Sequence, residues 1–156
     1  WSSDGTQVVT GGEEGTAFIW DITTGEQVLE LSGFADRLIS ADWSPDGRLL
    51  ATGDGANTAQ GDDVFAVRIW DTETGEQVQL LEEHNCFVND VAFSPDGDTL
   101  ASGSCDGFVY LWDTTTWEIV AALPAGDVRS LSWHEDGTQL MTIAYLDGTV
   151  MRWTIE

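Results

Sequence analysis

Short apolar runs alternate with polar turns along the whole chain, and the third such unit is the most regular. Residues 87–93 (FVNDVAF) predict a strand that ends at a Ser-Pro-Asp-Gly turn, where Pro95 cannot continue a strand ladder. Residues 99–103, 108–112 and 118–123 predict three further strands, separated by a Cys-Asp-Gly turn and a polar connection. Four short strands with tight turns predict an antiparallel meander, which is too small to bury both of its faces alone.

Two short phrases repeat along the chain in phase with each other. A phrase that ends in Trp-Asp occurs three times and a fourth copy ends in Trp-Thr, with the tryptophans at Trp20, Trp70, Trp112 and Trp153. A turn phrase begins at Trp1 (WSSDG), Trp43 (WSPDG), Phe93 (FSPDG) and Trp133 (WHEDG). A common period of roughly 40 residues predicts an array of one repeated unit, whose copies stack and bury a shared core. Because no run has helical periodicity, we expect an all-β fold.

These phrases resemble the WD40 repeat family over essentially the whole chain. The resemblance implies a β-propeller, in which blades of four antiparallel strands pack around an axis. We expect about four blades: residues 1–33 (partial), 34–83, 84–123 and 124–156, the last without a fourth strand.

The resemblance also implies a larger ring, commonly of about seven blades. We expect these residues to form its C-terminal part, with the natural C-terminus near Glu156 and further sequence before Trp1. The alternative is a homo-oligomer that closes one ring from several short chains.

The resemblance further implies a chain of hydrogen bonds inside each blade, because a buried imidazole, carboxylate and indole N–H each need a partner. Its members are a histidine before the first strand, a hydroxyl in the second, an aspartate in the next turn and the third-strand tryptophan. The third unit matches completely, with His84, Ser102, Asp106 and Trp112. The other units match in part. The first has Thr10, Glu14 and Trp20, the second has Thr52 and Trp70, and the fourth has Thr142, Asp147 and Trp153. Phe34 stands where the second unit should have its histidine.

The charge of the chain is strongly acidic. The chain has 28 Asp and Glu residues but only five basic residues, all of them arginine, so its net charge is −23. Since phosphate-binding surfaces need a basic stripe, we expect no nucleic-acid partner and no anionic membrane partner. No apolar run approaches the ~20 residues of a membrane span. The acidity is consistent with a solvated shell, a basic protein partner or a salt-rich habitat, and the sequence leaves the compartment open.

The histidines give no sign of an enzyme. His84 has a structural assignment and His134 lies in a turn, so no Ser-His-Asp or metal-hydrolase arrangement can be built. No glycine-rich phosphate loop follows a predicted strand. We therefore expect a non-catalytic protein that needs no cofactor.

Several residues are candidates for contacts with a protein partner. The resemblance implies that loops on one face of the propeller carry binding residues, and arginine or aromatic residues there are typical of hot spots. Arg37, Phe87 and Asp127 are candidates at the entry to the first strands. Asn85 is a candidate near Phe87, and Tyr145 is a candidate in the last loop between a second and a third strand. On the opposite face, Trp117 stands where the first two units have glycine, and it either contacts a partner or folds back on its own sheet.

The second unit contains a polar, acidic insertion within residues 53–63. Its oxygen-bearing side chains could gather around a calcium-type ion, namely those of Asp54, Asn57, Asp62 and Asp63. The spacing does not fit an EF-hand loop, so we favour a flexible or partner-contacting loop.

Cys86 and Cys105 lie beside His84 and Asp106, which should touch, so the two sulfurs should be close together. A disulfide is geometrically possible and would indicate an oxidising compartment. We favour two reduced thiols over that alternative.

Taken together, the sequence predicts a non-catalytic protein-interaction scaffold, which displays loops from one face of a rigid propeller to a protein partner. The alternative is a sensor or regulatory domain of a multidomain signalling protein such as an ATPase. Fold alone does not name the partner.

Overall fold

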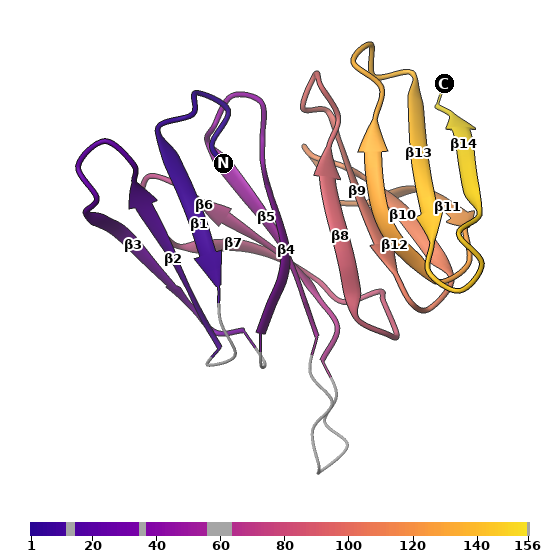
Figure 1. Ribbon diagram of the computed structural model, residues 1–156, viewed down its shortest axis with the longest axis horizontal. Coiled ribbons are helices and arrows are strands. Elements are labelled where there is room, and N and C mark those ends of the chain that lie inside the picture. Colours follow the sequence, from indigo (N-terminus) through magenta and orange to yellow (C-terminus); the bar gives the residue numbers. More distant parts are fainter. Residues whose placement is uncertain (12–14, 35–36, 56–63, 156) are drawn as a thin grey trace.

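The computed structural model describes residues 1–11, 15–34, 37–55 and 64–155 of the chain. Each regular element in these ranges is a β-strand, and the strands form four antiparallel sheets that stand side by side like the blades of a fan (Figure 1). The all-β prediction and the four-stranded meander are therefore confirmed. Within the described ranges, no helix is long and apolar enough to cross a membrane.

Within each sheet, strands that are neighbours in space are also consecutive in the chain. The first sheet contains β1 (Gln7–Gly11), β2 (Thr16–Asp21) and β3 (Gln27–Ser32). The second contains β4 (Arg37–Trp43), β5 (Leu49–Gly55), β6 (Val67–Asp71) and β7 (Gln77–Leu81). The third contains β8 (Val88–Phe93), β9 (Thr99–Ser104), β10 (Phe108–Asp113) and β11 (Ile119–Pro124). The fourth contains β12 (Val128–Trp133), β13 (Gln139–Ala144) and β14 (Val150–Thr154).

The Trp-Asp phrase ends β2, β6 and β10, and its aspartate begins the turn that follows each of these strands. Asp21, Asp71 and Asp113 each accept hydrogen bonds from two backbone N–H groups of that turn. These backbone bonds lower the pKa of all three carboxyl groups, because they stabilise the charged form. The repeated aspartate is therefore a turn-forming residue in each of the three blades.

Neighbouring blades approach closely where the second strand has a glycine. A Cβ atom added at Gly53 would lie 2.8 Å from the Val88 carbonyl oxygen, and one added at Gly103 would lie 2.5 Å from Val128 Cγ1. Apolar residues of the strands that carry the Trp-Asp phrase are completely buried, including Ile19 on β2 and Ile69 on β6. The core therefore lies between the blades rather than within one of them, as expected for stacked repeats.

Two half-buried aspartates connect the first strands of adjacent blades. The Phe93 N–H on β8 donates to Asp42 Oδ2 on β4 at 2.7 Å, and the Leu131 N–H on β12 donates to Asp90 Oδ2 on β8 at 2.7 Å. Burial raises the pKa of both carboxyl groups. These bonds hold the inner strands together at the narrow edge of the fan.

The outer face of the fourth sheet departs from the repeat. Ile143 occupies the place that Gly53 and Gly103 take in their blades, and 43% of its surface is exposed. Arg152 likewise occupies the place of the fully buried Ile69. The glycine and the buried isoleucine that allow one blade to pack against the next are therefore replaced on this face by a larger side chain and a charged one.

Candidate interaction face

The third blade contains the complete hydrogen-bonded chain around His84. The His84 Nδ1 atom lies 2.8 Å from Asp106 Oδ2, and Nε2 lies 2.9 Å from Ser102 Oγ. The Trp112 indole N–H donates to the same Ser102 oxygen at 2.9 Å. Because a carboxylate only accepts, the proton belongs on Nδ1, and the Ser102 hydroxyl then donates to Nε2. Burial lowers the pKa of His84, so the imidazole is neutral.

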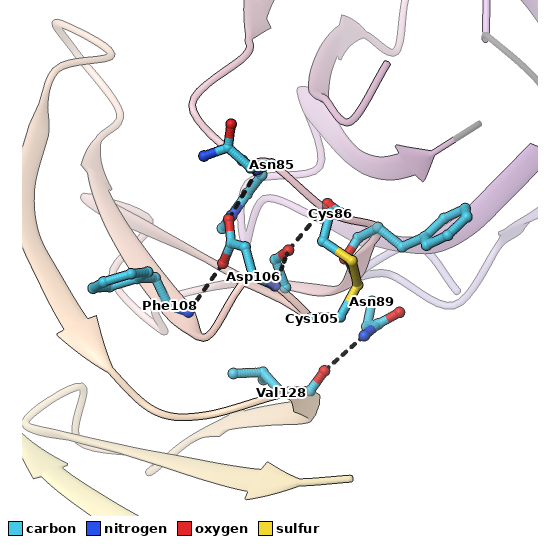
Figure 2. Close-up of a disulfide and its surroundings, with 10 residues drawn as sticks. Asn85, Cys86, Asn89, Cys105, Asp106, Phe108 and Val128 are labelled. Atoms are coloured by element: carbon cyan, nitrogen blue, oxygen red, sulfur yellow. Dashed lines mark hydrogen bonds and ion pairs between the residues drawn. A yellow bond between two sulfur atoms is a disulfide. The ribbon is translucent and has the colours of Figure 1, made fainter. Parts of the chain in front are cut away.

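This network positions the loop that leads into β8. Asp106 also accepts hydrogen bonds from the backbone N–H groups of Asn85 and Phe108, each at 3.0 Å (Figure 2). The Ser104 hydroxyl donates to the Cys86 carbonyl oxygen at 3.0 Å. The β9–β10 turn therefore holds both the side chain and the backbone of this loop.

A disulfide joins the same loop to the same turn. Cys86 and Cys105 are bonded, with their Cα atoms 5.3 Å apart (Figure 2). The structure therefore supports the disulfide rather than the two reduced thiols that the sequence favoured. Closing a loop of 19 residues in this way removes conformational freedom from the unfolded chain, an effect of about 3 kcal/mol.

Phe87 follows the disulfide and is the centre of an aromatic cluster. Its ring centroid lies 5.5 Å from that of Phe65 in an edge-on contact, and the Arg37 guanidinium lies 5.6 Å from the centroid of the Phe87 ring. A Cβ atom added at Gly55 would collide with the ring, so the glycine makes room for it. Arg37 and Asn85 are exposed, and both phenylalanines are half-buried. The structure therefore brings Arg37 and Phe87 together, and Asn85 lines one pocket with Phe65. We define Arg37, Phe65, Asn85 and Phe87 as the Phe87 cluster.

Asp127 and Tyr145 form a second group on the fourth blade. The Tyr145 N–H donates to the Asp127 carbonyl oxygen at 2.7 Å, and 61% of the Tyr145 surface is exposed. The Arg129 guanidinium lies 5.5 Å from the centroid of the tyrosine ring. Asn89 connects this blade to the third, since its side-chain amide donates to the Val128 carbonyl oxygen at 2.8 Å (Figure 2).

Sequence reasoning missed Phe65 and Arg129, both of which contact candidate residues. Phe65 follows the insertion and lies outside the repeated phrases, so no spacing indicated its position. Arg129 could have been found, because it lies two residues from Asp127 at the start of a predicted strand.

Trp117 is not an exposed contact residue. It is half-buried and packs against the core between the second and third sheets, so it folds back on its own sheet. Its φ of 58° matches the φ of 75° at Gly25 and Gly75, which occupy the same turn in the first two blades. The structure therefore favours packing over the partner contact that was the other interpretation.

The second blade replaces the histidine chain with a different arrangement. The Trp70 N–H still donates to Thr52 Oγ1 at 2.9 Å, and the Phe34 ring packs against Trp70 with centroids 5.2 Å apart. Asp54 is fully buried, and its Oδ2 atom lies 2.7 Å from Arg68 Nε. Asp54 Oδ1 accepts the Ala66 N–H at 2.9 Å.

Asp54 is therefore the partner of a buried arginine, which corrects its assignment as a candidate cation ligand. The other three candidates, Asn57, Asp62 and Asp63, lie outside the described residues. Among the residues that the structure describes, no group of three or more His, Cys, Asp or Glu side chains could hold a metal ion.

In the described part of the first and fourth blades, the tryptophan end of the chain is present. The Trp20 N–H donates to Thr10 Oγ1 at 2.8 Å, and the Trp153 N–H donates to Thr142 Oγ1 at 3.2 Å. Asp147 accepts the backbone N–H of Thr149 at 2.9 Å within its own turn. The position of Glu14 lies outside the described residues.

Comparison with known proteins identifies the repeat. The family model of the WD domain, G-beta repeat, matches residues 1–21, 25–60, 75–113 and 117–154. The chain belongs to the WD40 repeat family. WD40 repeats generally serve as protein-interaction scaffolds and are typically non-catalytic.

Individual relatives match parts of this WD40 chain. It is 48% identical over 42 residues to an uncharacterized WD repeat-containing protein of Schizosaccharomyces pombe, a match of 27% of this chain and 10% of that protein. It is 45% identical over 49 residues to the angio-associated migratory cell protein of Homo sapiens, covering 31% and 11%. It is 51% identical over 37 residues to coronin-7 of Mus musculus, covering 24% and 4%. The matched segments therefore span about a tenth or less of these relatives.

Proposed function

We propose that this WD40 chain binds a protein partner through the loops that precede β4, β8 and β12. The observation that carries the proposal is the Phe87 cluster, in which a half-buried aromatic ring contacts both Phe65 and the Arg37 guanidinium. Aromatic and arginine side chains are the residues that most often dominate binding energy at interfaces.

The loop that carries Phe87 is ordered before any partner arrives. The disulfide and three hydrogen bonds hold its backbone at successive residues: the Asn85 N–H donates to Asp106, the Cys86 carbonyl accepts from Ser104, and the Phe87 carbonyl accepts from the Cys105 N–H. Because the loop does not have to be ordered on binding, the conformational-entropy part of the cost of association is smaller, and more of the contact energy becomes affinity.

The charge of the chain favours a basic partner. A net charge of −23 attracts cationic proteins over long distances and increases their association rate. Glu82 and Glu83 are exposed in the loop that leads to Phe87, so the excess of negative charge extends to the proposed surface.

The experiment compares Phe87→Ala with Ile22→Ala in the full-length protein. Ile22 is 45% exposed in the turn after β2, on the opposite face, and provides a matched loss of apolar surface. Proteins captured from native extracts are quantified for both variants by mass spectrometry. We expect a set of partners whose recovery falls at least about tenfold with Phe87→Ala and is unchanged with Ile22→Ala. Equal recovery from both variants would overturn the proposal.

A further inference from the structure

A pocket beside the Phe87 cluster has its own chemical character. It has a volume of about 300 Å³ and is lined by Val64, Phe65, Glu82, His84 and Asn85. The lining comes from the segment before β6 and from the loop between β7 and β8, so two elements of adjacent blades form it. Its volume is at the lower end of the range for small-molecule sites, and it suits a single long side chain.

The polar groups of the pocket favour a positive charge. Glu82 contributes an exposed carboxylate, and Glu83 follows it in the same loop. His84 contributes no positive charge, because its imidazole is buried and its ring nitrogens are bonded to Asp106 and Ser102. Among the residues that the structure describes, the pocket lining therefore includes one anionic side chain and no cationic one.

The apolar wall of the pocket also suits a basic side chain. Phe65 is half-buried and is held in place by its edge-on contact with Phe87, and Val64 lies next to it. Aromatic rings attract guanidinium and ammonium groups, and the methylene stems of arginine and lysine pack well on apolar surface. The pocket thus places an aromatic wall and a carboxylate around one cavity, which is the combination that a long cationic side chain needs.

We propose that this pocket binds an arginine or lysine side chain of the protein partner, with Glu82 as its counter-charge and Phe65 as its apolar wall. The proposal rests on the proposed function, since it identifies a partner residue that binds beside the Phe87 cluster. The net charge of the chain makes the same demand of the partner as the pocket does, because both favour a cation.

The test uses two small probes that differ in charge and have nearly the same shape. N-acetyl-arginine methylamide and its citrulline counterpart are titrated into isotope-labelled protein, and binding is followed by NMR at Phe65, His84 and Asn85. We expect the arginine probe to bind with a millimolar Kd and the neutral citrulline probe to bind at least about tenfold more weakly, because a charge-assisted contact is lost.

Glu82→Gln and Glu30→Gln provide the matched variants. Both glutamates are exposed and both changes remove one negative charge, but Glu30 lies on β3 away from the pocket lining. We expect Glu82→Gln to weaken binding of the arginine probe about tenfold and Glu30→Gln to leave it unchanged.

Equal binding of the two probes, or equal effects of the two variants, would overturn the proposal. These outcomes do not depend on any partner protein. The probe titration can therefore contradict the proposed pocket while the capture experiment still supports partner binding through Phe87. Conversely, a negative capture experiment would not change the result of the probe titration.

Discussion

At the scale of single residues, His84 shows how burial converts an ordinary side chain into part of the scaffold. Only 5% of its surface is exposed, and both ring nitrogens are satisfied within the third blade. Burial lowers the pKa of the imidazole below its ordinary value, so the folded state resists protonation. The unfolded chain, whose histidine titrates near pH 6.5, therefore binds more protons as the pH falls.

We therefore expect the stabilisation that His84 provides to be fully present above about pH 6.5 and to be lost as the pH falls below this value. The measurement is the free energy of unfolding of the wild-type protein minus that of His84→Gln, by denaturant titration between pH 5 and 8. The subtraction removes the opposite contribution of Asp42 and Asp90, whose raised pKa values favour the folded state at low pH. A difference that stays constant with pH would contradict the prediction.

In the third blade, the residues that were predicted correctly are those that the resemblance to the WD40 family implied. His84, Ser102, Asp106 and Trp112 match one pattern, and their bonds follow from it. Arg68 was missed, because its buried partner Asp54 was interpreted as part of a polar insertion. The geometry of Phe87 could not be predicted either, since Phe65 lies beyond that insertion and contacts it only through the fold.

At the scale of the elements, the second and third blades solve one packing problem in two ways. Arg68 on β6 and Tyr110 on β10 occupy equivalent positions, two residues before the tryptophan of each blade. Arg68 pairs with Asp54 and lies 6.0 Å from the Phe34 ring centroid, whereas Tyr110 packs against His84 at 4.8 Å. The second blade thus combines the Arg68–Asp54 ion pair with Phe34, whereas the third blade combines the neutral Tyr110 ring with His84.

This correspondence predicts a compensating pair of substitutions. Arg68→Tyr alone leaves the fully buried Asp54 carboxylate without its counter-charge, and we expect a loss of about 3–5 kcal/mol in the free energy of unfolding. Adding Asp54→Ser reproduces Tyr110 and Ser104 of the third blade, and we expect the double variant to recover most of that loss.

Denaturant unfolding of the two single variants and the double variant forms a double-mutant cycle that measures the coupling. Arg48→Tyr is the control, because Arg48 is exposed in a turn and its loss should change stability little. Additive effects of Arg68→Tyr and Asp54→Ser would show that the pair is not coupled.

The strands themselves were predictable because their signals are local. Alternating apolar residues and Asp-Gly turns indicated each strand of the third blade to within one or two residues. The register irregularities near the starts of β4, β8 and β12 were not predictable, since no local sequence signal marks them. The departure of the fourth sheet at Ile143 was not predictable either. It can be recognised only once the structure shows that the equivalent glycines of the other blades contact the next blade.

At the scale of the whole molecule, the charge acts against the compact fold. A net charge of −23 over 156 residues brings many like charges together on folding, and their repulsion destabilises the compact state. Few attractive pairs offset this repulsion within the described part of the chain. In that part of the chain, the ion pair formed by an arginine is Arg68–Asp54. Because this pair is buried, salt screens its attraction only weakly.

We therefore expect added salt to stabilise the protein. Raising NaCl from 0.01 M to 0.15 M shortens the Debye length from about 30 Å to about 8 Å, which screens repulsion between separated carboxylates. At pH 7 the melting temperature, measured by circular dichroism, should rise by several degrees over this range, and sucrose at equal osmolarity should not reproduce the rise. Near the isoelectric point of about 4.1 most of this repulsion is absent, so the same salt should have little effect. A melting temperature that falls with salt at pH 7 would mean that attractive surface pairs outweigh the excess of negative charge.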